Sequence, residues 1–239
     1  MARTSLRAAA AAGRRQGISC YASVEMSTHE TLIDDLAAGR APGLVPISVI
    51  QFHRMVETGI LTDGEPVELI EGMLVRKDRG LAGRRDMVHG PRHALVVARL
   101  QRLAARLEGL GCHLRSQLPV TLSGLDEPEP DLAIVKGAPE DYASRHPGPK
   151  DVVAVVEVAD STVDFDRTTK QRLYSTAGIA SYWIVNIPED RIEVFELPRP
   201  EERRYARRLE VGREETARLT LAAGTLEVAA SSVLPPRRS

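Results

Sequence analysis

The run Asp151-Val152-Val153-Ala154-Val155-Val156-Glu157-Val158 is the most informative part of the sequence, because it is almost continuously aliphatic and still carries a carboxylate near its end. Such a run predicts a β-strand that is covered on both faces of a sheet. An isolated carboxylate there costs several kcal/mol unless it is paired, protonated or bound to a metal ion. A second strand is predicted at Asp131-Leu132-Ala133-Ile134-Val135, which opens with an acid directly after Pro130. Two strands that each deliver a carboxylate predict one cation site, formed by Asp131 and Glu157.

Composition is that of an ordinary globular protein. The chain has 239 residues and a formal net charge of −1, so the total charge neither favours nor excludes a polyanionic partner. The two cysteines, Cys20 and Cys112, lie far apart and form no ligand cluster. A chain this long and this poor in cysteine does not need disulfides, which favours a cytoplasmic location. No apolar stretch approaches the length of a membrane span.

We expect a single domain with two tails. Residues 1–43 are predicted to be a disordered extension, since the first 24 residues are rich in Ala and Arg and contain no acid before Glu25. That composition is typical of a targeting peptide or of an upstream translation artefact, and Met26 is a plausible true start. The domain is expected over residues 44–233, and residues 234–239 are expected to be a frayed tail.

The pattern between the tails predicts a mixture of helices and strands. Ser48 is a candidate helix cap, Glu71-Gly72 is a candidate hairpin turn, and Pro91 opens an apolar stripe at helical spacing that ends at Gly109 and Gly111. The remaining expected elements are strands at 118–122, 131–135, 151–158, 182–185 and 192–195, a helix at about 166–177, an irregular segment at 142–150, and two or three weaker strands after Tyr205.

Lys170 is the second chemical signal. Asp166, Lys170, Leu173, Tyr174 and Ala177 share one helical face, and a lysine within such a core-facing stripe is unusual. Lys170 could snorkel beside an internal ion pair with Asp166, as their four-residue spacing permits. Alternatively its ammonium group projects to Glu157 and Asp131, where it would orient a water molecule and stabilise charge on a scissile phosphate. The two strand carboxylates favour this second interpretation.

The order of these features resembles the PD-(D/E)xK nuclease superfamily and, within it, the Uma-two family of proposed restriction endonucleases. The matching pieces run from roughly Ile47 to Phe195. They are Val67-Glu68-Leu69-Ile70-Glu71-Gly72, His93, Pro130-Asp131-Leu132-Ala133, Val156-Glu157-Val158-Ala159-Asp160-Ser161-Thr162, Asp166, Lys170, Tyr174, Gly178 and Tyr182-Trp183-Ile184-Val185. Ala159 stands where the superfamily pattern expects a lysine. The family places that lysine on the following helix, and Lys170 fills the role here.

The resemblance implies an α/β restriction-endonuclease-like core, with a mixed sheet, flanking helices and a C-terminal β-rich extension. It implies that Asp131 and Glu157 bind Mg²⁺ or Mn²⁺, because all-oxygen coordination suits a hard cation. Lys170 would assist the attacking water in hydrolysis of DNA phosphodiester bonds. It also implies a homodimer, since nucleases that cut duplex DNA commonly pair two sites.

Two further residues carry two interpretations each. Glu68 is either the additional acid that such nucleases bring to the metal or a solvent-facing strand residue. His93 is either a satisfied histidine in the first turn of a packed helix or a neighbour of the active site, hydrogen-bonded to a carboxylate. His89 lies four residues earlier, but Gly90-Pro91 makes a shared zinc face unlikely. The remaining histidines show no constellation.

Two arginine groups are candidate phosphate contacts. One surrounds the helix after Pro91 (Arg84, Arg85, Arg92, Arg99, Arg102, Arg106), and the other brackets Tyr205 (Arg203, Arg204, Arg207, Arg208). Such runs are more often solvated faces, and nearby acids dilute the second group. Three classes of function therefore stay open: a metal-dependent endonuclease, a catalytically silent nuclease-fold binding or assembly module, and a two-carboxylate glycosidase. Lys170 and the scarcity of aromatic residues count against the glycosidase.

Overall fold

The computed structural model describes residues 45–62, 64–77 and 90–237. The chain divides into the units Met1–Gly43 and Leu44–Ser239, and every residue described below belongs to the second unit. The expected disordered extension therefore lies outside the described residues. None of the helices in the described ranges is long and apolar enough to cross a membrane.

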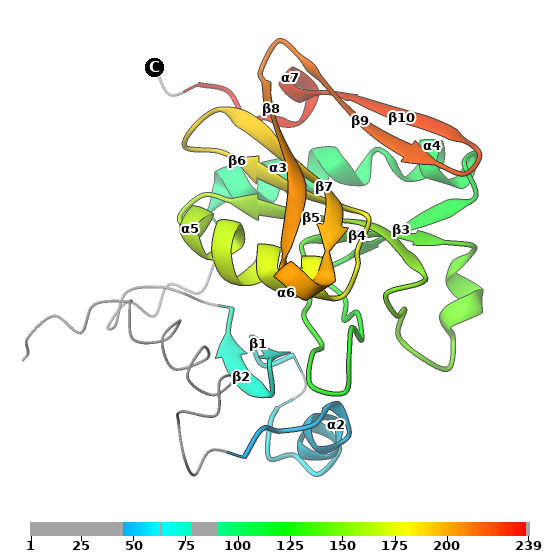
Figure 1. The fold of residues 1–239 in the computed structure, drawn as a ribbon, viewed down its shortest axis with the longest axis vertical. Coiled ribbons are helices and arrows are strands. Elements are labelled where there is room, and N and C mark those ends of the chain that lie inside the picture. The colour runs from blue at the N-terminus through cyan, green and yellow to red at the C-terminus, as the bar shows by residue number, and fades with distance from the viewer. Residues whose placement is uncertain (1–44, 63, 78–89, 238–239) are drawn as a thin grey trace, which may run out of the picture. The chain divides into compact units, whose positions relative to one another are not determined.

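A six-stranded mixed sheet forms the centre of this unit (Figure 1). Its order is β3-β4-β5-β6-β7-β8, and within it only β5 and β6 pair in parallel. The strands are β3 (Cys112–Ser116), β4 (Leu132–Lys136), β5 (Val152–Ala159), β6 (Ser181–Asn186), β7 (Arg191–Arg199) and β8 (Arg204–Gly212). The parallel pair requires a crossover, and the chain supplies it with α5 (Val163–Phe165), a π-helical turn, η2 (Asp166–Lys170), and α6 (Gln171–Thr176). The fold is thus the expected mixed α/β sheet with flanking helices.

The two faces of the sheet bury two separate cores, as the aliphatic strands require. Val156, Val158 and Trp183 face one core, which is closed by α3 (Pro91–Gln101), α4 (Ala104–Glu108), α7 (Ala230–Val233) and the hairpin β9 (Thr216–Leu221) and β10 (Gly224–Ala229). Val155 and Tyr182 face the other core, where Leu173 and Tyr174 of α6 pack. Glu157 alternates with Val156 and Val158, so its side chain lies on the α6 side of the sheet.

A smaller lobe of the same unit precedes the sheet in the chain. It contains α2 (Val49–Glu57) and the hairpin β1 (Val67–Ile70) and β2 (Met73–Arg76). Ser48 caps α2 in a capping box with Gln51, as expected. Glu71 and Gly72 turn the hairpin with positive φ angles of 50° and 73°. A Cβ atom on Gly72 would lie 2.4 Å from Pro46 Cβ, so the lobe also needs glycine for close packing.

The structure differs from the sequence prediction in the segment before β4. The strand expected at 118–122 does not form, because the amides of Val120 and Leu122 donate to Pro128 and Asp126 of the following loop, whereas the amide of Thr121 between them donates to Pro147. The sheet is extended instead by β3, and Gln117, with φ of 52°, ends its path. The helix after Pro91 is also interrupted, since α3 ends at Gln101 and α4 begins at Ala104.

Leu234 and Pro235 contact the rest of the domain. Leu234 is fully buried, and its carbonyl accepts a hydrogen bond of 2.5 Å from Arg99. The carbonyl of Pro235 accepts another from Arg213 at 2.6 Å. The packed part of the chain therefore continues past Val233, into the segment for which a frayed tail was predicted.

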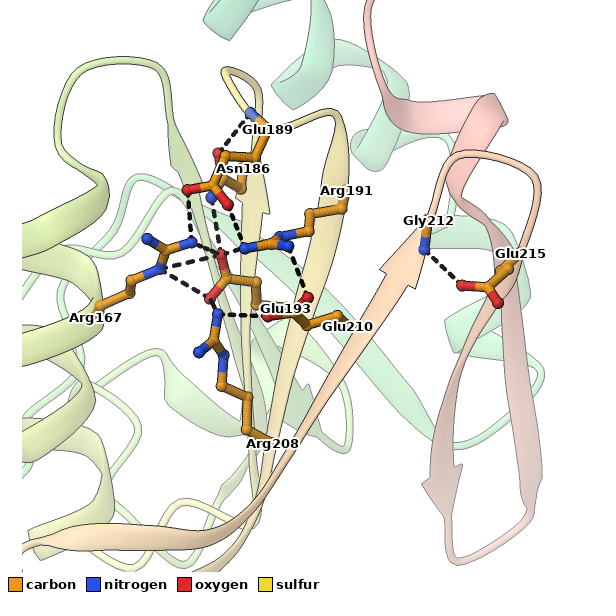
Figure 2. Close-up of polar contacts among 9 residues, drawn as sticks. All are labelled: Arg167, Asn186, Glu189, Arg191, Glu193, Arg208, Glu210, Gly212 and Glu215. Atoms are coloured by element: carbon orange, nitrogen blue, oxygen red, sulfur yellow. Dashed lines mark hydrogen bonds and ion pairs between the residues drawn. The ribbon is translucent and has the colours of Figure 1, made fainter.

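A network of charged residues fixes η2 to the sheet (Figure 2). Glu193 of β7 is fully buried, and Arg167 of η2 donates to both of its carboxylate oxygens. Asn186 donates to Glu193 at 2.8 Å, and Arg208 lies 2.8 Å from the same carboxylate. Arg191 lies beside it and pairs with Glu210 at 2.6 Å. The crossover turn that carries Lys170 is thereby held against β7.

Candidate active site

Asp131 and Glu157 lie side by side where β4 begins and β5 approaches its end. Leu132 pairs with Val156 across β4 and β5, so the residue before Leu132 lies opposite the residue after Val156. The amide of Asp131 donates to Glu157 Oε2 at 3.2 Å, and the amide of Val158 donates to Asp131 Oδ2 at 2.8 Å. The antiparallel register therefore brings together the two carboxylates that the strand pattern predicted to share one site.

Lys170 projects from η2 to two carboxylates. Its Nζ atom lies 2.6 Å from Glu68 Oε2 and 3.3 Å from Glu157 Oε1. The exposed fractions are 2% for Glu68, 4% for Lys170 and 6% for Glu157, so the three charges interact with little solvent screening. The structure thus brings Glu68 of β1 into the site with Lys170, and Glu68 is not a solvent-facing strand residue.

The π-helical turn is a feature that sequence reasoning missed. A π turn holds one residue more than an α turn and often occurs at functional sites. It ends at Lys170, and α6 then presents Tyr174 to the same place. The Tyr174 hydroxyl donates to Glu157 Oε1 at 2.8 Å. The Lys170 ammonium group and the Tyr174 hydroxyl therefore both lie against the carboxylate of Glu157.

His93 lies in the first turn of α3 and contacts Asp131. The His93 Nε2 atom is 3.0 Å from Asp131 Oδ2, and His93 is buried. Burial by itself lowers the pKa of His93, but the hydrogen bond to Asp131 and its negative charge outweigh this, and the pKa is raised. His93 is thus a neighbour of the site, hydrogen-bonded to one of its carboxylates.

Electrostatics of the site favour a bound cation. Burial raises the pKa of Glu157, the charges of Asp131 and Glu68 raise it further, and Lys170 and Tyr174 oppose them. Three carboxylates and one lysine leave an excess of negative charge in a region of low dielectric constant. An all-oxygen set of carboxylates suits a hard divalent cation such as Mg²⁺. The donor set therefore fits the metal ion that the family resemblance implies.

The site opens into a cavity of about 1100 Å³. All five residues named as candidates from the sequence line it: Glu68, His93, Asp131, Glu157 and Lys170. Two further charged residues of the lining, Lys77 and Glu129, were not predicted, and they form an ion pair with each other. Burial lowers the pKa of Lys77, and the neighbouring charge of Lys170 lowers it further while Glu68 opposes this. No sequence signal marks Lys77.

The same cavity is lined by two histidines for which we predicted no constellation, and this prediction is wrong. His53 of α2 lies 2.5 Å from Glu127 through Nε2 and Oε1. His146 stands beside them, and one ligand atom from each of the three residues lies within 4.8 Å of the others. These residues come from three separate segments, so no spacing in the sequence could have shown that they meet.

The two arginine groups have different surroundings. Arg84 and Arg85 of the first group lie outside the described residues. The second group is paired with acids: Arg203 with Glu71, Arg204 with Glu202, Arg207 with Glu196, and Arg208 with Glu193 and Glu210. Ion pairs with this many carboxylates leave little positive charge for phosphates. The second group therefore does not form a strongly basic face.

A comparison with solved structures identifies a protein with a similar fold. The crystal structure of a protein described as a putative nuclease belonging to DUF820, from Anabaena variabilis, superposes with a TM-score of 0.53. The two chains are 13% identical, and the match covers 79% of this chain and 97% of the other. A likeness at this identity shows that the two chains share a fold. No curated protein matches the chain.

The family follows from a second comparison. Residues 50–231 match the model of the Uma2 family, which is described as "Putative restriction endonuclease". The chain belongs to this Uma2 (Uma-two) family. The match contains Glu68, His93, Asp131, Glu157 and Lys170 and extends through β8, β9 and β10. The strands after Phe195, where the resemblance was less clear, are therefore part of the family's domain.

Proposed function

We propose that the protein is a metal-dependent endonuclease that hydrolyses DNA phosphodiester bonds at the site built by Asp131, Glu157, Glu68 and Lys170. The observation that carries the proposal is the convergence of three carboxylates and one lysine at the wall of one cavity. A salt bridge that served stability alone would not need this excess of buried negative charge. The family and the fold support hydrolysis of nucleic acid.

Asp131 and Glu157 are the proposed metal ligands, with Glu68 as a third ligand that binds directly or through water. Mg²⁺ is the proposed ion and Mn²⁺ its substitute, because both accept oxygen ligands. A divalent cation there supplies Lewis acidity toward the phosphoryl oxygen and toward water. The carboxylates of Asp131, Glu157 and Glu68 repel one another. Hydrogen bonds from other groups of the chain hold them in place.

The residues around the ligands have distinct proposed roles. Lys170 is placed between Glu68 and Glu157, where its ammonium group would orient the attacking water and offset the charge that develops on the phosphate. The Tyr174 hydroxyl fixes Glu157, and His93 fixes Asp131. Burial raises the pKa of Tyr174 well above its usual range, so the hydroxyl remains a hydrogen-bond donor at neutral pH.

DNA is the proposed partner and a homodimer the proposed assembly, both from the family resemblance. The cavity contains Lys77 and Lys170 as lysines that could approach a phosphate. Solution scattering at micromolar concentration tests the assembly, and a monodisperse monomer would remove the homodimer from the proposal.

The test combines calorimetry with nicking of supercoiled plasmid in the presence of Mg²⁺ or Mn²⁺. We expect the wild type to bind metal and to nick. Asp131→Asn and Glu157→Gln should bind metal more weakly and lose activity by at least about 100-fold, and Lys170→Met should lose activity by a similar factor while it still binds metal. Glu108→Gln is the matched control, since Glu108 is an exposed acid on α4 outside the cavity.

Each alternative outcome has a clear meaning. Metal-dependent nicking that persists in both Glu157→Gln and Lys170→Met would exclude the proposed mechanism. A wild type that binds metal and DNA but does not nick would instead support a catalytically silent nuclease-fold module. A wild type that binds no metal would show that the carboxylates have a structural role.

A further inference from the structure

We propose that His53, Glu127 and His146 form a second cation site, selective for a divalent transition-metal ion of the zinc class. The site would be separate from the proposed all-oxygen site, although both sets of residues line the same cavity. This inference does not depend on nuclease activity, since it concerns other residues and a different kind of metal ion.

The chemistry of the three side chains selects the metal. Imidazole nitrogen suits zinc, copper, iron and nickel, whereas Mg²⁺ prefers oxygen ligands. Two histidines and one carboxylate are a ligand set that occurs in zinc proteins that keep the fourth position open. A fourth position here would be available to water, because the three residues line the cavity.

The geometry is close to that of such a site. Ligand bonds of about 2.0–2.2 Å in a tetrahedral arrangement separate neighbouring ligand atoms by about 3.3 Å. One ligand atom from each residue lies within 4.8 Å of the others, and the rings of His53 and His146 stand 6.1 Å apart at 76°. Glu127 and His53 are 2.5 Å apart in a hydrogen bond, which a metal ion would replace by a small rotation of each side chain.

Glu127 is prepared for this role by its surroundings. Its exposed fraction is 2%, and its backbone exchanges hydrogen bonds with Leu69 of β1. Thr121 Oγ1 donates to Glu127 Oε2 at 2.6 Å, which leaves Oε1 directed at His53. A hydroxyl that orients a carboxylate in this way is a common second shell of metal sites. Glu127 is thus held in place by these hydrogen bonds, and the side chains of the two histidines can rotate toward it.

His146 distinguishes a metal site from a simple histidine–carboxylate pair. Its ring has no hydrogen-bond partner among the residues that the structure describes, although it is half-buried beside Glu127. A metal ion would tie together α2, the segment before β4 and the irregular segment around His146. The proposed ion would therefore hold these three segments together at the wall of the cavity.

The test uses the full chain without a polyhistidine tag, stripped with chelator and titrated with Co²⁺, whose d–d absorption reports nitrogen ligation. The background is the Asp131→Asn, Glu157→Gln double variant, so that the proposed all-oxygen site does not contribute. We expect one equivalent of Co²⁺ to bind and Zn²⁺ to displace it. His53→Gln and His146→Gln in this background should each weaken binding by at least about 10-fold.

Two results would overturn the inference: a parent protein that binds no Co²⁺, or histidine variants that bind it as tightly as the parent. If the double variant does not fold, the wild type with Mg²⁺ in excess replaces it as the parent. Both histidines are partly exposed, so their glutamine variants are expected to fold, which circular dichroism checks. Failure of this test would leave the proposed nuclease site unaffected, because nicking is measured separately.

Discussion

At the scale of single residues, Tyr174 shows how the site is held by groups that do not themselves bind metal. We expect Tyr174→Phe to weaken Mg²⁺ binding by about 10-fold, because Glu157 loses the donor that orients it. Tyr205→Phe is the control, since Tyr205 is buried in the same aromatic group and donates to the Ile179 carbonyl instead. Calorimetry compares the two. Equal affinities would show that Tyr174 only supports packing.

Glu193 gives a prediction for the dependence of stability on pH. Burial raises the pKa of Glu193, but hydrogen bonds from Arg167 and Asn186 outweigh burial and the pKa is lowered. A carboxylate with a lowered pKa stabilises the fold fully above its ordinary value of about 4.3, and this stability is lost as pH falls through the folded-state value. Between pH 7 and pH 3 we expect the free energy of unfolding to fall less in Glu193→Gln than in the wild type.

The Glu193→Gln variant should also be less stable at pH 7, by about 1–3 kcal/mol, because its arginine partners lose a buried acceptor. Denaturant titrations at a series of pH values measure both effects. Parallel pH profiles for the two proteins would contradict the assignment of this titration to Glu193.

At the scale of elements, η2 couples the charged network to the active site. Arg167 and Lys170 belong to the same π-helical turn, and each pairs with a carboxylate on the same side of the sheet. We expect Arg167→Gln to lower the rate of plasmid nicking by about 10-fold, since small displacements of a catalytic group are costly. Arg191→Gln is a matched control: Arg191 lies beside the same acids and is equally exposed, but it belongs to β7. Equal losses in both variants would refute a positioning role for Arg167.

Elements with strong periodicity could be predicted from the sequence, and weaker ones could not. The aliphatic run of β5 and the capped helix α2 formed as expected. The segment 118–122 favours a strand by composition, yet Pro119 has no amide to donate and its neighbours bond to two irregular segments, 126–128 and Pro147. β3 was missed although apolar Cys112 and Leu114 alternate with polar His113 and Arg115, because this alternation is confined to five residues. In these two segments, tertiary hydrogen bonds rather than local sequence preference determined the secondary structure.

For the whole molecule, the order of elements along the chain was enough to predict part of the site. Contacts between residues far apart in the sequence could not be predicted in this way. Asp131 directly precedes β4, Glu157 lies in β5 and Lys170 lies in the crossover that follows β5, so their convergence could be inferred from the order of strands and helix. Lys170 and Glu68, by contrast, meet across 102 residues, and the resemblance to a family alone suggested it. His53 and Glu127 meet across 74 residues with no such guide. A contact of that kind depends on how the hairpin lobe packs, which no periodicity encodes.

Because the proposed metal site joins Glu68 of β1, Asp131 directly before β4 and Glu157 of β5, metal binding should stabilise the folded unit. A ligand at 100 times its dissociation constant adds about 2.7 kcal/mol to the free energy of unfolding, which for a chain of this size raises the unfolding midpoint by about 5–10 °C. We expect this rise when Mg²⁺ is added to chelator-treated wild type, measured by thermal unfolding. Glu157→Gln should show almost none of it, and Glu108→Gln should keep it in full. A rise of the same size in Glu157→Gln would place the bound Mg²⁺ elsewhere in the protein.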